Sequence, residues 1–458
     1  MNSKLKSRLS ISIAGLALVA LACTCSLGGL TPDTPVQPAP LPAATDVSIP
    51  TKPPILGNGD LQVVNTAAVA NDYGGWRLMG EVSNDTSADV NGVSLKIEWF
   101  DSAGTSLGSD TGYVLTTNIG TGETAPFAYT IYDSDVALAS FTASIAEFTS
   151  TQDVQRAVLD VAAPTFFVDS FGTFHCVGEI TNNTGSPVDI DGLAAAVHDA
   201  SGSLFSAASY WAVMRHLEPG QKTPFRISPE GLTGAVASDY TCAVFVDAQT
   251  TESTPDNGVA FKDTNGDGDA GNDIYYYIDG YGSTHLVGEI VNGGSDTMNV
   301  QMIGGLYDAS GNTVDADYAS PAVALAPGEA LPYDFTTFLS PDVKPDVSTF
   351  TAYVDPYWTY AAYSQTVPLR VDNLSSQNDN GTFTVTADVV NDQTFNLDYA
   401  YAIGTVTDAT GKVVGYNYTP TSALTSGAKE TVNFTIYADP SLDPATLQVN
   451  MIARASKP

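Results

Sequence analysis

The chain has 458 residues and a formal net charge of −34 at pH 7, with 51 acidic residues against 17 basic ones. This acidic balance argues against a nucleic-acid partner and against direct contact between the folded part and anionic lipid. Beyond the N-terminus no apolar run reaches the roughly 18 residues that a membrane-spanning helix needs.

The N-terminal segment reads as an export signal. Lys4, Lys6 and Arg8 precede the apolar run 11–22, which is too short to span a bilayer. Cys23 follows small residues directly, and this arrangement resembles the lipobox of bacterial lipoproteins. The resemblance implies cleavage after residue 22, lipidation of Cys23 and an extracytoplasmic location on the cell membrane. Secretion without a lipid is the alternative.

Residues 23–57 are rich in proline. Such a composition predicts an extended tether without a hydrophobic core. At about 3.1 Å per residue, the tether could reach on the order of 100 Å from its anchor.

One pattern then occurs four times. A segment of the form Gly-Glu-apolar-x-Asn occupies 80–84, 178–182 and 288–292, with a looser copy at 387–391. Each copy is followed by an Asp-x-x-Gly turn and then by a second glycine turn. The aspartates of the first turn, at positions 101, 199, 308 and 408, lie 98, 109 and 100 residues apart. A period of this length indicates a repeated domain rather than a solenoid unit.

Each copy predicts a β-sandwich. Its central strand alternates apolar and polar residues with period two, which indicates a half-buried strand of an antiparallel sheet. About seven short strands in roughly 100 residues are typical of an immunoglobulin-like sandwich. We therefore predict an all-β chain of four tandem immunoglobulin-like antiparallel β-sandwich domains. The predicted boundaries are 58–150, 156–250, 257–356 and 367–458.

The third copy carries a family resemblance. Its segment Leu306-Tyr307-Asp308-Ala309-Ser310-Gly311, flanked by Gly288-Glu289 and Pro327-Gly328, resembles the FxLYD domain, a β-sandwich module of bacterial and archaeal envelope proteins. The leading phenylalanine of that motif is absent from all four copies. The resemblance implies the fold and a place in the cell envelope, but no activity or ligand.

Cys176 and Cys242 occupy inward positions on two strands of the second copy. In an exported domain this placement predicts a disulfide across the core, and two buried free thiols are the alternative.

The segment 263–273 of the third copy is an acidic insertion. Its first residues are spaced like the ligands of a calcium loop, with a glycine at the sixth position. The residue at the twelfth position is Ile274, where such loops place a bidentate acid, and no helices flank the segment. We predict either an irregular structural calcium site or a solvated acidic hairpin loop. The candidate ligands are Asp263, Asn265, Asp267, Asp269 and Asp273.

Aromatic residues cluster where the third copy ends, among them Tyr357, Trp358 and Tyr360. Exposed, they would offer a stacking surface for sugars or for a partner protein. Buried, they would form the contact between the third and fourth domains.

No metalloprotease, nucleophile-elbow, phosphate-loop or zinc-site motif is present in the sequence. We therefore predict a protein that is not an enzyme and that requires no cofactor. Two functions remain: a lipid-anchored structural spacer or protein-interaction module of the cell envelope, and an adhesive or polysaccharide-binding lipoprotein that uses the third copy's aromatics.

Overall fold

The computed structural model describes residues 61–71, 74–151, 156–209, 211–229, 239–252, 255–337, 339, 345–346 and 349–457. The predicted signal peptide, tether and lipidation site, including Cys23, lie outside these ranges. The described residues form antiparallel strands joined by turns, and their helical segments are two single 3-10 turns, η3 (Ala270–Asp273) and η4 (Pro444–Thr446). The prediction of an all-β sandwich chain is confirmed.

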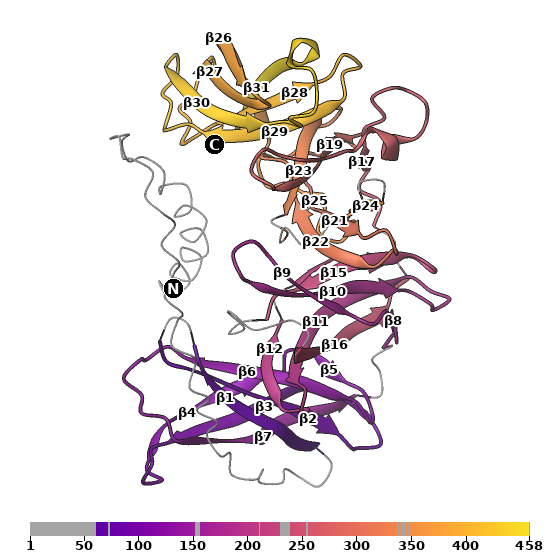
Figure 1. Cartoon of the computed structure of the whole chain (residues 1–458), viewed down its shortest axis with the longest axis vertical. Coiled ribbons are helices and arrows are strands. Elements are labelled where there is room, and N and C mark those ends of the chain that lie inside the picture. Colours follow the sequence, from indigo (N-terminus) through magenta and orange to yellow (C-terminus); the bar gives the residue numbers. More distant parts are fainter. Residues whose placement is uncertain are drawn as a thin grey trace, which may run out of the picture. The chain divides into compact units, whose positions relative to one another are not determined.

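The ladders group into four successive sets of strands, coloured from indigo to yellow in Figure 1. We call these sets repeat 1 (61–151), repeat 2 (160–250), repeat 3 (259–361) and repeat 4 (366–456). All of the described strands belong to one compact unit, so the number of independently folding domains stays a prediction.

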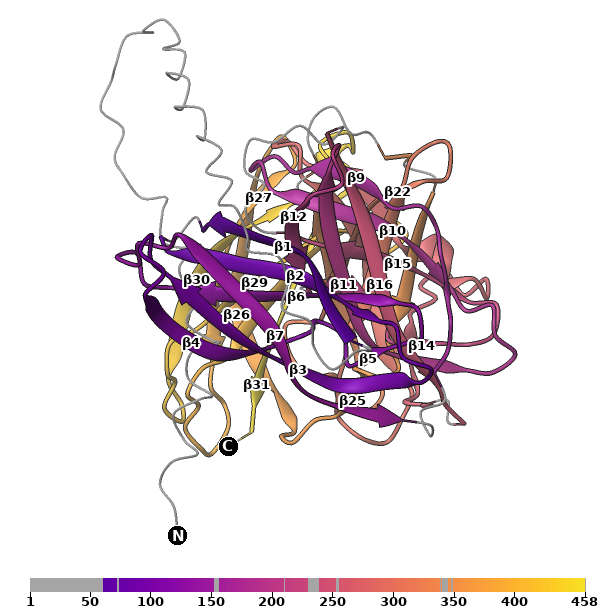
Figure 2. The same cartoon turned by 90° about the horizontal axis from the view of Figure 1, so that it is seen from below.

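Repeat 1 is a sandwich of two sheets, which Figure 2 views from below. The first sheet runs in the order β1 (Leu61–Ala70), β2 (Trp76–Asn84), β6 (Thr124–Ile131). In the second, β3 (Asp89–Phe100) pairs with β4 (Ser106–Tyr113), β5 (Asn118–Ile119) and β7 (Ser140–Thr151). Leu78 and Phe127 of the first sheet and Leu95 and Phe141 of the second share one buried core.

Repeat 2 keeps this plan. Its first sheet contains β8 (Asp160–Val161), β9 (Thr165–Val168), β10 (Phe174–Thr181), β13 (Trp211–Val213) and β15 (Lys222–Ile227). Its second sheet contains β11 (Val188–Asp199), β12 (Leu204–Ala208), β14 (His216–Leu217) and β16 (Tyr240–Thr250).

Repeat 3 divides its strands among three ladders. The first sheet contains β17 (Val259–Phe261), β18 (Tyr275–Ile278), β19 (Thr284–Asn292) and β23 (Ala330–Thr337). The second contains β21 (Met302–Tyr307), β22 (Thr313–Ala319) and β24 (Phe350–Val354), and β20 (Met298–Asn299) pairs with β25 (Tyr360–Ala361).

In repeat 4 one long strand belongs to both ladders. The order is β29 (Val413–Pro420), β28 (Tyr401–Thr407), β31 (Gln448–Ser456), β26 (Thr366–Asp379), β27 (Thr382–Val390), β30 (Lys429–Tyr437). The start of β26 pairs with β31 and its remainder pairs with β27.

The asparagine that ends each Gly-Glu segment is fully buried, and in repeats 1 and 2 it ties the first sheet to a strand of the second. Asn182 lies at the end of the first sheet of repeat 2. Its Nδ2 donates to the carbonyl oxygens of Ser186 and Leu217, both at 2.9 Å, and its Oδ1 accepts the Thr184 N–H. Leu217 belongs to the second sheet. Asn84, Asn292 and Asn391 make the same three bonds in their own repeats and have no exposed surface.

The backbone of the same asparagine fixes the glycine turn. In repeat 2 the Asn182 carbonyl accepts the Gly220 N–H at 2.7 Å, and the Asn182 N–H donates to the backbone carbonyl of Gln221. Gly220 has a φ of 80°, a left-handed conformation that favours glycine. The equivalent backbone hydrogen bond joins the glycine to the asparagine in every repeat, which explains why both residues recur in all four copies.

The first glycine of the motif makes room for an aromatic ring. Gly80 is the cross-strand partner of Phe127, and a Cβ at Gly80 would lie 2.5 Å from that ring. Repeats 2 and 3 pair their glycines with Phe225 and Tyr333. Repeat 4 replaces the pair with Ala387 and Val432, so the loss of glycine there is matched by the loss of the ring.

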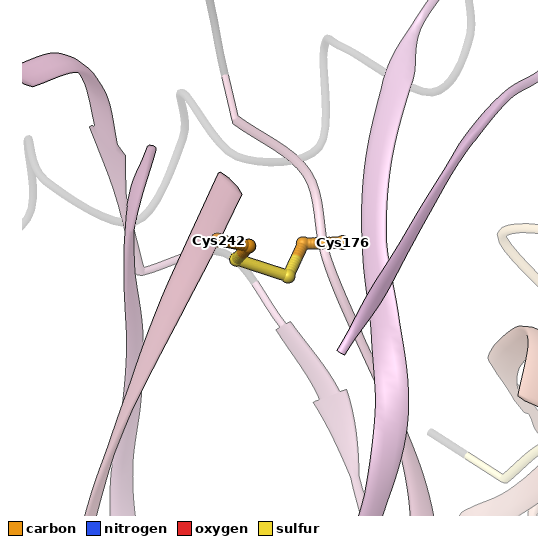
Figure 3. Close-up of a disulfide and its surroundings, with 2 residues drawn as sticks. All are labelled: Cys176 and Cys242. Atoms are coloured by element: carbon orange, nitrogen blue, oxygen red, sulfur yellow. A yellow bond between two sulfur atoms is a disulfide. The ribbon is translucent and has the colours of Figure 1, made fainter. Parts of the chain in front are cut away.

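Repeat 2 has a covalent clamp as well. Cys176 of β10 and Cys242 of β16 form the predicted disulfide between the two sheets (Figure 3). The bond spans 66 positions of sequence, which in the chain-entropy account contributes about 3–4 kcal/mol to the free energy of unfolding.

We predict that Asn182→Ala lowers the free energy of opening of repeat 2 by about 1–3 kcal/mol, because the buried Leu217 carbonyl loses its donor and the more exposed Ser186 carbonyl loses a second bond. Native-state hydrogen exchange of the β10 and β11 amides measures this quantity. Asn183→Ala is the matched control, since the exposed Asn183 side chain donates to the Asp160 carboxylate at 3.2 Å. Equal protection in the two variants would contradict the clamp.

Candidate functional site

The outer face of each Gly-Glu strand is buried in repeats 1 to 3. The alternation predicts a half-buried strand, but Met79, Val177 and Val287, all on the outward side, have no exposed surface. The half-buried expectation is therefore wrong for these strands. A second apolar layer covers them, and this layer comes from the next repeat.

Equivalent strands provide the cover at each junction. The strand that follows the Asp-x-x-Gly turn lies against the preceding repeat: β12 against β2, β22 against β10, and β29 against β19. At the first junction Met79 joins a cluster with Ala196, Leu204 and Ala207. At the third junction Val287 shares a cluster with Val413 and Tyr416.

The two outermost faces are polar. Strand β4, which corresponds to β12, is mostly exposed and reads Ser-Leu-Gly-Ser-Asp-Thr-Gly-Tyr. At the other end Thr386 of β27 stands where the other repeats have Met79, Val177 and Val287, and it is partly exposed. Repeat arrays commonly carry polar outer faces on their terminal units.

The two recurring motifs meet across the junctions. Glu81 of the first Gly-Glu segment contacts His198 at 3.5 Å, and Glu179 of the second accepts the Tyr307 hydroxyl at 3.3 Å. His198 and Tyr307 are both the residue before an Asp-x-x-Gly turn. At the first two junctions the glutamate of one repeat therefore contacts the residue that precedes the Asp-x-x-Gly turn of the next.

A buried ionic cluster joins repeats 2 and 3. Arg226 of β15 lies 3.2 Å from the Asp315 carboxylate and 2.7 Å from that of Asp317, both on β22. Burial raises the pKa of Asp315 to about 7, although the positive charge of Arg226 acts to lower it. Removing one partner of such a buried pair leaves an uncompensated charge and is strongly destabilising.

The other two junctions also use buried polar groups. The Asp247 carboxylate of repeat 2 accepts N–H groups of Thr117 and Asn118 from repeat 1, at 2.9 and 3.0 Å. Between repeats 3 and 4, Tyr275 donates to Asp439 at 2.6 Å and Tyr277 donates to the Tyr437 carbonyl at 2.8 Å. These directional bonds add to the apolar contact and favour one orientation at each junction.

Two equivalent histidines have opposite pKa shifts. His175 contacts Asp169 at 3.1 Å; burial lowers its pKa, and nearby Arg226 lowers it further. For His285, burial also disfavours the charged form, but the carboxylates of Asp279 and Asp334 outweigh it and raise its pKa to about 9. Asp334 stands where repeat 2 has Arg226, at the same register position of the paired strand.

The glutamates four residues along the strand from these histidines pair with lysines. Glu179 pairs with Lys222 at 2.6 Å and Glu289 pairs with Lys262 at 2.6 Å. Residues four apart on a strand lie about 13 Å apart, so each carboxylate instead reaches a cation on a neighbouring strand.

The predicted aromatic cluster is brought together only in part. Tyr357 and Trp358 pack edge to face with centroids 5.8 Å apart, and the Arg215 guanidinium of repeat 2 lies 4.9 and 5.4 Å from them. Their side chains keep 44 and 38% of their surface exposed. The buried contact with repeat 4 is therefore wrong for this pair. Tyr360 lies in β25 and is 46% exposed.

The buried Asp355 carboxylate shapes this aromatic turn. It accepts the N–H groups of Tyr357 and Trp358 and, across the junction, that of Arg215. Burial raises the Asp355 pKa, while these bonds oppose the rise.

The acidic insertion folds around its own backbone. The two Asp263 carboxylate oxygens accept the N–H groups of Gly266 and Gly268, and Asp273 accepts that of Thr264. Asn265, Asp267 and Asp269 each accept from the residue two positions on. Within the described residues no group of three acidic, histidine or cysteine side chains is arranged to hold a metal ion. A calcium site stays a prediction.

The junction residues were not predicted from the sequence, although the outward positions of the four copies contain a signal for them. The outward residue before the motif glycine is Met, Val and Val in repeats 1 to 3 and Thr in repeat 4. The strand after the Asp-x-x-Gly turn is polar in repeat 1 and richer in apolar residues in the others. Comparing outward positions between copies would have indicated which faces are covered.

Comparison with known proteins adds no identification. No protein-family model matches the chain, and no match was found among curated proteins. In the part of the chain that is described, no helix is long and apolar enough to cross a membrane.

We predict that His285 stabilises repeat 3 below about pH 6.5 and that this contribution, on the order of 3 kcal/mol, disappears as the pH rises through about 9. The folded-state pKa is raised above the ordinary value, so the folded protein holds the proton more tightly than the unfolded chain. The stability difference between wild type and His285→Gln, measured by urea denaturation between about pH 6 and 10, should shrink with rising pH. A difference that stays constant over this range would contradict the buried charged histidine.

Proposed function

We propose that this chain is a lipid-anchored extracytoplasmic protein whose four repeats form one stiff spacer or interaction scaffold at the cell envelope. The N-terminal signal with Cys23, the proline-rich tether and the disulfide support export and anchoring. The resemblance to FxLYD domains is compatible with the same location.

The repeated junction is the observation that carries the proposal. At each junction an apolar face and buried polar bonds link one repeat to the next, as Met79, Arg226 and Tyr277 illustrate. Flexibly linked domains would need no such contacts, because domains that move freely share small, polar interfaces. A stiff array on a long tether suits a protein that holds a position away from the membrane.

An adhesive or carbohydrate-binding role is the second candidate. It is favoured by Tyr357 and Trp358, whose rings are held by Arg215 and stay partly exposed. Rigid aromatic rings of this kind give contact area at low entropic cost.

We predict that Met79→Asp separates repeats 1 and 2 without unfolding them, because a buried carboxylate would face an apolar cluster. Small-angle X-ray scattering should show a larger radius of gyration, while circular dichroism keeps its strand signal. Thr386→Asp is the matched control, since the equivalent face of repeat 4 is partly exposed. A scattering curve unchanged by Met79→Asp would contradict the stiff array.

The anchor has its own test. Expressed in a lipoprotein-processing bacterium, the wild-type chain should partition into detergent and carry acyl groups on Cys23, and Cys23→Ser should move it to the aqueous phase. Cys25→Ser is the matched control and should stay in the detergent phase. A water-soluble wild-type chain would overturn the anchor without affecting the stiffness of the repeats.

A further inference from the structure

A hollow of about 420 Å³ lies where repeat 3 meets the segment leading into repeat 4. Three segments line it: the turn after Asn292, the turn at Pro327, and residues 361–366. Its volume falls within the range of small-molecule sites, about 300–1,000 Å³.

Tyr363 marks the rim of the hollow with a fully exposed side chain. A single exposed aromatic residue on a protein surface is ordinary. This one differs because it lines a hollow beside polar side chains that make no hydrogen bond within the described residues. Its ring is an accessible flat apolar face held on a short segment, since the neighbouring Ala362 N–H donates to the Thr297 carbonyl at 2.7 Å.

The polar side chains of the hollow are available for a ligand. Asp296 and Gln365 are exposed, and neither side chain makes a hydrogen bond or ion pair within the described residues. Thr366 also lines the hollow, and its hydroxyl is buried without a hydrogen-bond partner among those residues. Buried polar groups without partners are uncommon and call for an explanation.

The comparable hollow between repeats 1 and 2 is different. There Arg156 reaches in and pairs with Glu123 at 2.7 Å and with Asp89 at 3.7 Å, so the charged groups satisfy one another. In repeat 3 the residue equivalent to Glu123, Glu329, pairs with Arg454 instead. Neither member of that ion pair lines the hollow beside Tyr363, where the Asp296 carboxylate makes no ion pair within the described residues.

We propose that this hollow binds a neutral saccharide, with one sugar ring stacked on Tyr363 and its hydroxyl groups hydrogen-bonded to Asp296 and Gln365. The C–H face of a sugar ring is apolar and fits a flat tyrosine ring. A carboxylate accepts hydrogen bonds from hydroxyl groups, and an amide both accepts hydrogen bonds from them and donates to them. The Asp296 charge and the net charge of −34 disfavour acidic saccharides. The inference does not depend on the lipid anchor or on the stiffness of the array.

The test uses the full chain and five trisaccharides: maltotriose, cellotriose, mannotriose and N,N′,N″-triacetylchitotriose as neutral probes, and trigalacturonate as the acidic probe. Saturation-transfer NMR and calorimetry should detect at least one neutral probe with a dissociation constant of about 10 mM or tighter. Tyr363→Ala should weaken that binding about tenfold. Asp296→Ala should weaken it severalfold.

Tyr132→Ala is the matched control, because Tyr132 is an exposed tyrosine of repeat 1 and should leave binding unchanged. Circular dichroism confirms that each variant folds, and both tyrosines are exposed enough for removal to leave the core intact. The proposal is overturned if no neutral probe binds, if trigalacturonate binds more tightly than all of them, or if Tyr363→Ala binds as wild type does.

Discussion

A buried asparagine side chain in each repeat is the constraint on which the rest of this structure depends. Its amide donates to two carbonyl groups and accepts one N–H, and its backbone holds the glycine turn. Neither Asp nor Ala could make both donations, so the position tolerates little change. In repeats 1 and 2 this side chain joins the two sheets at the end of the Gly-Glu strand.

The Gly-Glu strand has two roles because both of its faces are covered. Its inward face packs in the sandwich core, where Gly80 accommodates the Phe127 ring. Its outward face packs on the next repeat through Met79 and its equivalents. The glutamate then contacts the residue before the next Asp-x-x-Gly turn in the first two junctions. A mutation in this strand would therefore affect the packing of its own repeat and the junction with the following one.

The sequence was sufficient for the fold class and for the disulfide, because period-two alternation and inward cysteines depend on local geometry. It was not sufficient for the junctions. Alternation shows which residues share a face but not what covers the second face, as Val177 illustrates. The partner of Tyr357 and Trp358 is Arg215, far earlier in the chain, and no local pattern indicates that contact. The raised pKa of His285 depends on Asp334 across a ladder, which needs the register. The predicted lipidation, domain boundaries and calcium site stay predictions.

The central claim is that one asparagine side chain per repeat is fully buried and hydrogen-bonded at the end of the Gly-Glu strand. Solution NMR of the side-chain amide groups of Asn84, Asn182, Asn292 and Asn391 after transfer into heavy water tests it most directly. We predict that the hydrogens of these four groups take hours longer to exchange than those of exposed asparagines such as Asn183, because each side chain is fully buried and one of its two donations goes to a buried carbonyl. Complete exchange of all four within the first spectrum would contradict the account.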